Sequence, residues 1–334
     1  MYKRYDAIDV ERGIGAILVI LGHAGIIGLS KTVLYSFHMP LFFFLSGIFL
    51  KYDSKHRTEF ILKRVYNILV PYFLFYMLLF AKECILVLIG HGSWKNMVKL
   101  LIGMVLQMRT TEYGGKFWFL PVLFGGTLIC AITEEFVYKL QKKSIRLICA
   151  GISFLGGCAS IILLKKPLLW NLDAAMIAAS FMIIGMTAKE KFLELFTLEK
   201  KKCVFLFCVA AIGNISFALW NFWITGRNSD LYWMVIGNPI IYTLASYAGI
   251  LAITMLAACY QPKMIAFIGR NSLLYYCLHH EFVFPVLKIV VAFLPWQRLA
   301  PYYMTVFACI LIAPLCVLIK RYAPLFAGIK TYKR

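Results

Sequence analysis

The sequence predicts an all-α membrane protein: a polytopic bundle of about ten transmembrane helices with the N- and C-termini in the cytoplasm. Of its 334 residues, 62% are hydrophobic and only 15% are charged, which leaves too little polar surface for a water-soluble protein of this length. Several apolar runs approach or exceed 18 residues, the length of a membrane-spanning helix. The N-terminus is short and charged, lacks a signal-peptide cleavage motif and precedes further apolar runs, so we expect it to open an uncleaved first helix.

Ten apolar segments are expected to cross the membrane in this bundle. The weakest of them contains Asn171 and Asp173, which we interpret as interfacial residues near the outer end of the sixth span. The segments are residues 11–30, 34–50, 66–90, 117–138, 146–164, 168–187, 203–222, 235–259, 272–294 and 301–320.

The positions of the cations support this count. With the N-terminus inside, 24 lysines and arginines fall on cytoplasmic segments and nine on outer segments. Membrane proteins show this bias toward positive cytoplasmic loops, and one span more or fewer would disrupt the alternation. The net charge of +20 therefore needs no nucleic-acid partner, because the cations lie in short clusters between apolar runs.

The whole chain, residues 1–334, is expected to form one integral membrane domain without a separate soluble domain. Its longest outer connection, 91–116, contains an amphipathic stretch that begins at Trp94 and suits a helix in the outer interface or a partial re-entrant segment. All ten cysteines fall inside apolar segments and none forms a CxxC pair. We therefore predict neither a disulfide framework nor a metal site.

The stretch from Arg12 to His23 contains the strongest candidate for chemistry. In one helix the two residues lie about 16 Å apart along the axis, which places Arg12 at the membrane surface and His23 near mid-membrane. An ionisable group at that depth is costly and marks a functional site. Histidine transfers protons near neutral pH, so His23 is a candidate general base for acyl transfer to a hydroxyl. The alternatives are a histidine that itself carries the acyl group and a hydrogen-bonded packing histidine.

Further candidates lie at both membrane surfaces. Five cations between Lys51 and Arg64, with Lys63 among them, suit the phosphates of a nucleotide-bearing donor or of anionic lipid headgroups. On the outer side, His38 opens the second span, and we expect it to border an acceptor there or to be interfacial. Lys116 and Trp118 lie where an aromatic run either forms a platform for a sugar ring or belongs to an aromatic belt.

The ninth span contains His279, His280 and Glu281. Two histidines and a carboxylate in a membrane helix are hard to explain by packing alone, so we predict that His279 and Glu281 contact substrate. Glu281 is expected to pair with a histidine, with Lys82 or with Lys288. Walker, HExxH, GxSxG and HxxxxD motifs are all missing from the sequence.

Several of these motifs resemble those of one family. The Arg12-x10-His23 spacing resembles the signature of the acyltransferase-3 family of integral membrane acyltransferases, and the decapeptide that starts at His38 is similar to the second-helix motif of its fucose-4-O-acetylase-like branch. The third, fourth and C-terminal motifs of the family resemble Arg64 with Pro71, Trp118-Phe-Leu, and Ser272-x3-Tyr276-x2-His279.

This resemblance implies a bacterial plasma-membrane O-acetyltransferase. It would transfer the acyl group from cytoplasmic acyl-CoA, usually acetyl-CoA, to a hydroxyl of a cell-surface polysaccharide or lipid-linked glycan. Membrane lipids would surround the enzyme. His23 matches the essential histidine, Arg12 the arginine that holds the phosphorylated end of CoA, and Arg64 a cationic third-helix position. Many members have a second arginine where this chain has Asn67, so a two-arginine clamp would need Lys63 or Arg57 as a substitute.

The competing interpretation is a transporter or exporter of a lipid-linked sugar without acyl-transfer chemistry. Intramembrane His, Glu and Lys residues would then form a proton relay. The sequence lacks the paired half-repeats and interrupted helices that carriers use, which disfavours this interpretation.

Overall fold

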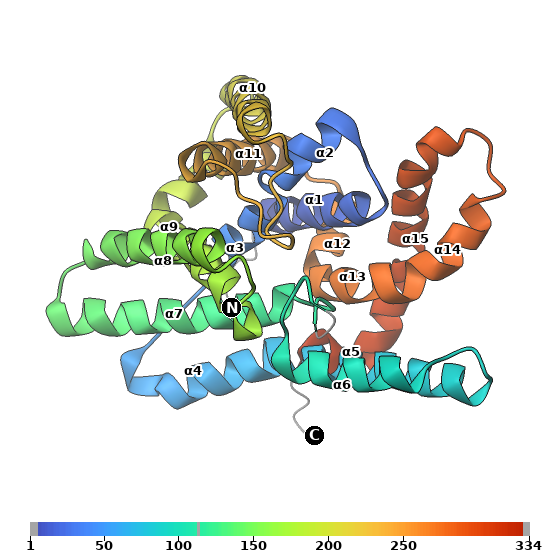
Figure 1. The fold of residues 1–334 in the computed structure, drawn as a ribbon. Coiled ribbons are helices and arrows are strands. Elements are labelled where there is room, and N and C mark those ends of the chain that lie inside the picture. The colour runs from blue at the N-terminus through green and yellow to red at the C-terminus, as the bar shows by residue number, and fades with distance from the viewer. Residues whose placement is uncertain (1–5, 112–113, 330–334) are drawn as a thin grey trace. The chain divides into compact units, whose positions relative to one another are not determined.

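A computed structural model describes residues 6–111 and 114–329, and within them the protein is helical with no β-strand. Figure 1 shows how the helices follow one another. The α-helices are α1 (Asp6–His23), α2 (Gly28–Tyr35), α3 (His38–Ile48), α4 (Arg57–Arg64), α5 (Val70–Leu88), α6 (Trp94–Leu106), α7 (Phe119–Leu140), α8 (Ile145–Leu164), α9 (Leu172–Glu194), α10 (Lys200–Thr225), α11 (Pro239–Cys259), α12 (Lys263–Arg270), α13 (Ser272–Leu278), α14 (Phe284–Val291) and α15 (Ala300–Tyr322).

Eight helical segments in the described part of the chain are long and apolar enough to cross a membrane, which agrees with the predicted all-α bundle of about ten spans. The orientation of the termini stays a prediction. The eight segments are Ser54–Leu88, Phe119–Leu140, Ile145–Leu164, Leu169–Thr197, Lys200–Thr225, Pro239–Cys259, Ser272–Val291 and Gln297–Tyr322.

The two N-terminal spans differ from the expected ones. The predicted span 11–30 is not one helix, because α1 starts at Asp6 and ends at His23, and Gly25 then takes a positive φ of 95° that ends the helical path. The predicted span 34–50 is divided between α2 and α3. At eleven residues, α3 is shorter than the roughly 20 that cross a bilayer.

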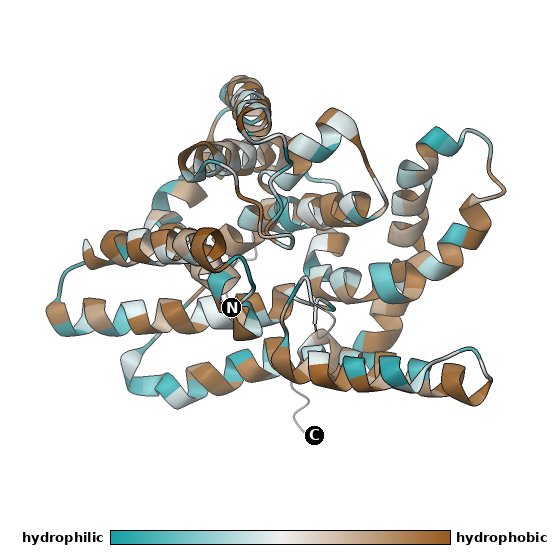
Figure 2. Cartoon of the chain, viewed as in Figure 1, coloured by the Kyte–Doolittle hydropathy of each residue, from teal (hydrophilic) through white to brown (hydrophobic). Residues whose placement is uncertain are grey.

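Large hydrophobic side chains cover the outside of several helices. Figure 2 shows hydrophobic residues along the length of α7 and α8, and α8 leaves Ile152 and Leu155 64% and 67% exposed. Water-soluble monomers do not expose apolar surface this extensively. The pattern is that of helices whose outer faces contact lipid.

The described residues form two compact units, each made of segments that are distant in the chain. The first unit comprises residues 6–45, 188–230 and 235–318, and the second comprises 46–111, 114–187, 231–234 and 319–329. Helices α3, α9 and α15 contribute residues to both units. The prediction of one membrane domain without a soluble domain stays a prediction.

In the first unit, α1 packs on α12 with almost no side chains between the two backbones. A Cβ on Gly269 would lie 1.7 Å from the carbonyl oxygen of Asp9, and a Cβ on Gly13 would lie 2.0 Å from that of Ile265. Glycine is required at both positions, because only a residue without a side chain permits this approach. The crossing fixes the position of α1 against the segment that continues from α12 into α13.

The second unit uses the same device between α3 and α9. A Cβ on Gly47 would lie 2.0 Å from the carbonyl oxygen of Met182.

Helix α6, which the sequence predicted as an amphipathic stretch, starts at Trp94 and leaves that side chain 72% exposed. Its place in the outer membrane interface stays a prediction.

Candidate active site

Helix α1 carries Arg12 and His23 on one continuous helix, so the expected separation of about 16 Å along the axis holds. His23 is the last residue of that helix and is exposed, so protein atoms leave its surface open. At a helix C-terminus the backbone dipole favours a positive charge. An imidazolium formed at His23 is therefore stabilised by the helix that carries it. The mid-membrane depth of His23 stays a prediction.

His279 forms a short hydrogen bond with His23. Nδ1 of His23 lies 2.6 Å from Nε2 of His279, and the two ring planes are parallel to within 4°. His279 is 1% exposed, and its Nδ1 donates to the backbone carbonyl of Tyr275 at 2.9 Å. The structure thus brings together two predicted site residues that are 256 positions apart in the chain. The predicted contact of His279 with substrate stays a prediction.

A π-helical turn shapes the segment that carries His279. Residues His279–Val283 form a π-helix in which the N–H of Phe284 donates to the carbonyl of His279, five residues earlier. Pro285 follows in the first turn of α14, where it has no N–H for the carbonyl four residues before it. Wider turns of this kind accommodate such a break and recur at functional sites.

His280 and Glu281 complete this cluster. Nδ1 of His280 lies 2.8 Å from Oε1 of Glu281, and the His280 ring lies 5.3 Å from that of His23 at an angle of 66°. Of the three pairings expected for Glu281, the structure shows the one with a histidine. His23 therefore has two imidazoles beside it and a carboxylate one residue further out. The role of Glu281 in contacting substrate stays a prediction.

His38 lies in the same unit and is buried at 7% exposure. Its Nδ1 donates to the carbonyl of Leu34 at 2.8 Å, and its ring packs against Tyr35 at 4.9 Å. The Tyr35 hydroxyl in turn donates to the carbonyl of Gly22, the neighbour of His23. His38 is thus connected through Tyr35 to the end of α1. The predicted role of His38 in bordering an acceptor stays a prediction.

The cationic end of α1 contains a buried carboxylate that the sequence analysis did not single out. Glu11, beside Arg12, is fully buried and accepts a 2.7 Å hydrogen bond from the Thr254 hydroxyl of α11. Asp9, 2% exposed, lies 3.7 Å from Arg270 of α12. Arg12 itself is half-buried. A carboxylate buried between apolar helices needs such partners. The presence of acidic residues next to an apolar run was therefore the sequence signal for this buried cluster.

Arg64 and Lys63 end α4 in the second unit. Arg64 is half-buried, its guanidinium lies 5.1 Å from the ring centre of Phe60, and its buried Nε has no hydrogen-bond acceptor among the described residues. Lys63 is exposed. A buried donor of this kind is costly to leave unpaired, so the position fits an anionic ligand. A second π-helix, Val65–Leu69, follows directly and precedes Pro71.

Lys116 and Trp118 lie just before α7 in the second unit. Trp118 is 7% exposed and packs edge-on against Tyr232 at 5.9 Å. The backbone carbonyl of Lys116 accepts from Gln107 at 2.8 Å and from Tyr76 at 3.0 Å. Trp118 is therefore a buried side chain and not part of an exposed aromatic belt. The predicted contacts of both residues with a sugar stay predictions.

The comparisons with known proteins agree with the motif order. The acyltransferase-3 family model, described as an acyltransferase domain, matches residues 5–321. The chain belongs to the acyltransferase-3 family. No curated protein and no solved structure gives a match. Because the matched range includes both histidines of the short pair and both motif arginines, family membership favours a membrane acyltransferase over a transporter without chemistry.

The departure from the common acyltransferase-3 pattern has a structural explanation. Asn67 stands in the π-helix after Arg64, where many members have a second arginine. With its nitrogen turned toward them, its side-chain amide donates to the carbonyls of Lys63 at 3.2 Å and Gly328 at 3.0 Å. Asn67 therefore ties α4 to the C-terminal segment through its side-chain amide.

A hollow of about 530 Å³ lies beside the start of α4 in this family member, lined by residues that include Lys55, Lys143, Asp53 and Glu134. The backbone N–H of Lys55 and the imidazole of His56 hold the pKa of Asp53 below its usual value. The lining therefore contains both lysines and carboxylates, and Glu134 is already paired with Arg146. Arg64, with its buried Nε lacking an acceptor among the described residues, is the better anion position of this unit.

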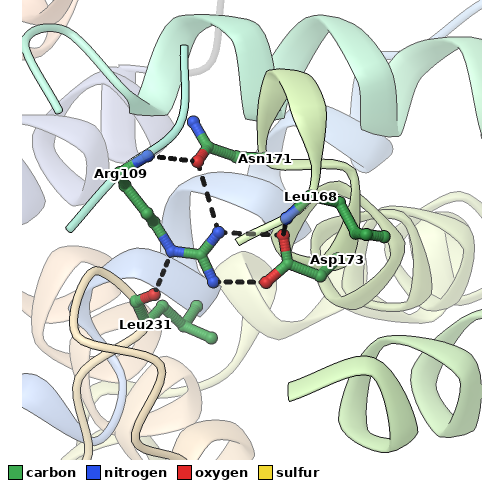
Figure 3. A network of polar contacts seen from close by, with 5 residues as sticks. All are labelled: Arg109, Leu168, Asn171, Asp173 and Leu231. Carbon is green, nitrogen blue, oxygen red and sulfur yellow. Dashed lines mark hydrogen bonds and ion pairs between the residues drawn. The ribbon is translucent and has the colours of Figure 1, made fainter. Parts of the chain in front are cut away.

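Asn171 and Asp173, interpreted from the sequence as interfacial, are fully buried within the protein. Figure 3 shows both side chains turned toward Arg109, which is also fully buried. The guanidinium of Arg109 donates to the two carboxylate oxygens of Asp173 at 2.9 and 2.6 Å, to Asn171 at 3.3 Å and to the carbonyl of Leu231 at 2.8 Å. From the sequence, Arg109 was predicted only as an outer cation, although an aspartate in an apolar segment requires a partner.

Proposed function

We propose that the protein transfers an acetyl group from cytoplasmic acetyl-CoA to a hydroxyl of a cell-surface polysaccharide or lipid-linked glycan at the plasma membrane. The observation that carries this proposal is the exposed imidazole of His23, held at the end of α1 by a 2.6 Å hydrogen bond to His279. Family membership supplies the reaction class, and the membrane-capable helices supply the setting.

Two features support an acyl-CoA donor. Arg12 lies on the helix of His23, about 16 Å away along the axis, and CoA likewise separates its phosphates from its thioester by a long pantetheine arm. Arg64 offers a half-buried guanidinium whose Nε has no acceptor among the described residues. Planar guanidinium groups recognise phosphates through paired N–H donors, and Lys63 adds a second positive charge beside Arg64.

The reaction that this arrangement serves is a proton-coupled acyl transfer. His23 removes the proton from the acceptor hydroxyl as the hydroxyl oxygen attacks the thioester carbonyl. The carbon–sulfur bond then breaks, the new oxygen ester forms, and the thiolate of CoA takes the proton back from His23. The dipole of α1 and the bond to His279 both favour the imidazolium that exists between these two proton transfers.

The experiment uses acetyl-CoA labelled in the acetyl group and membranes that contain the protein and the host's glycans. Mild alkali releases label from O-esters and leaves N-acetyl groups intact, so alkali-labile glycan label measures the proposed product. We expect His23→Ala to lower this transfer by about 100-fold or more, the usual contribution of a general base. His91→Ala, a change at an exposed histidine, is the matched control. Wild-type transfer by His23→Ala, or no alkali-labile label with the unaltered protein, would overturn the proposal.

A further inference from the structure

We infer that His279 is a positioning residue that fixes the tautomer and the direction of the His23 ring, so that Nε2 of His23 is the basic nitrogen. The inference rests on the proposed function, in which His23 is the general base. It assigns His279 a task that contact with substrate alone would not require.

The protons of the two rings follow from their partners. A backbone carbonyl only accepts hydrogen bonds, so the 2.9 Å contact to Tyr275 requires a proton on Nδ1 of His279. A neutral imidazole carries one proton, and Nε2 of His279 is then an acceptor. The proton in the 2.6 Å bond therefore belongs to Nδ1 of His23. Nε2 of His23 is left with its lone pair, directed away from His279.

The environment of His279 keeps this direction fixed. The carbonyl of Tyr275 lies one helical turn before His279, and the Tyr275 hydroxyl donates to the carbonyl of Cys309 in α15 at 3.0 Å. Phe284 packs edge-on against the His279 ring at 5.5 Å, and the ring itself is 1% exposed. Because α13 and α14 contact the ring directly and α15 anchors Tyr275, His279 can hold His23 without adjusting its own position.

The bond gains strength when His23 takes a proton. Nδ1 of His23 remains the donor, but it now belongs to a cation, and such charge-assisted bonds are about twice as strong as neutral ones. The other ionisable groups around the ring are His280, with its partner Glu281, and His38. None of these three groups hydrogen-bonds to His23 among the described residues, whereas His279 does, so removal of His279 should change which nitrogen of His23 carries the proton.

Two amide variants separate this role from simple packing. In His279→Gln, the longer side chain brings an amide oxygen to the former position of Nε2, where it accepts from His23. In His279→Asn, the shorter amide reaches only the former position of Nδ1. We expect His279→Asn to lower the rate of acetyl transfer about 10- to 100-fold, as loss of an orienting partner does for metal-bound histidines, and His279→Gln to recover most of it. Equal thermal unfolding midpoints of the two variants establish that both fold.

Nitrogen NMR of histidine-labelled protein in bilayers provides a readout that does not depend on activity. The His23 signals are assigned by their loss in His23→Gln. We expect the neutral His23 ring to carry its proton on Nδ1 in the wild type and in His279→Gln, and to shift toward the Nε2–H form in His279→Asn. A wild-type ring protonated on Nε2, or equal activities of the Gln and Asn variants, would overturn the inference. If the wild type transfers no acetyl group, the proposed function fails, while the NMR result still tests the histidine pair.

Discussion

The buried ion pair between Arg109 and Asp173 is expected to be a large single contribution to the stability of the second unit. The perturbation is Asp173→Asn, which keeps the size of the side chain and removes its charge. The Arg109 guanidinium then stays fully buried, with neutral partners in place of the carboxylate that accepted bonds of 2.9 and 2.6 Å. Leaving one charge of a buried pair without its partner costs about 3–5 kcal/mol.

The chain offers a matched control in the same unit. Arg146 and Glu134 also form a two-pronged contact, through Nε and one terminal nitrogen of Arg146, with both bonds at 2.7 Å. Their side chains are 22% and 14% exposed, whereas those of Arg109 and Asp173 are 0% exposed. The Arg146–Glu134 pair is partly exposed, so Glu134→Gln should cost only about 1 kcal/mol. The two substitutions change the same chemistry and differ in burial.

The measurement is the free energy of unfolding, obtained from reversible unfolding in mixed micelles with increasing denaturing detergent. Arg109→Gln and the double variant complete a cycle, in which the double variant should be less destabilised than the sum of the single ones by about 2 kcal/mol or more. Equal losses from Asp173→Asn and Glu134→Gln would refute the argument from burial. Additive losses in the cycle would refute the pairing itself.

Three further predictions concern the packing of the helices. Gly269→Ala places a Cβ 1.7 Å from a carbonyl oxygen of α1 and should lower the free energy of unfolding by about 2 kcal/mol or more, while Gly151→Ala, with open space around its Cβ, should not lower it. Thr254→Val removes the 2.7 Å donor to the buried Glu11 and should cost about 1–3 kcal/mol, also measured by unfolding; no loss would mean that Glu11 has another donor. Gln107 makes three donor contacts and accepts from the N–H of Gly115. Gln107→Leu removes all of these bonds, so it should loosen the chain there and speed proteolysis after Gly115; unchanged proteolysis would contradict this.

The fold class and most helices followed directly from hydropathy and charge. Apolar runs of the right length predicted the long helices, because a membrane span must satisfy all its backbone groups internally. The end of the first span was predicted wrongly because the apolar run continues past His23, whereas the helix ends there. Gly25 and Gly28, both with positive φ, were the available signals for the break.

The candidate site was predictable residue by residue but not as a set of contacts. His23 and His279 were both singled out as ionisable groups in apolar segments. Their pairing depends on the crossing of α1 with the segment after α12, and no local pattern encodes a contact across 256 positions. The same limit applies to Arg109. Its sequence position shows only a charged residue in a connection between apolar segments, and its burial became visible only when the structure placed it beside Asp173.

The position of His23 depends on two contacts at different places on α1. Near its start, Gly13 and Gly269 let the helix backbone touch α12, and about 15 Å further along the axis His23 meets His279. Residues 263–283 run from α12 through α13 into the π-turn with one non-helical residue between the helices, so both contacts refer to one stretch of chain. Two anchors fix both the translation and the tilt of a helix, whereas one fixes neither. A shift at the glycine crossing should therefore lengthen the histidine hydrogen bond, so the packing of α1 on α12 supports the geometry proposed for His23 as well as stability.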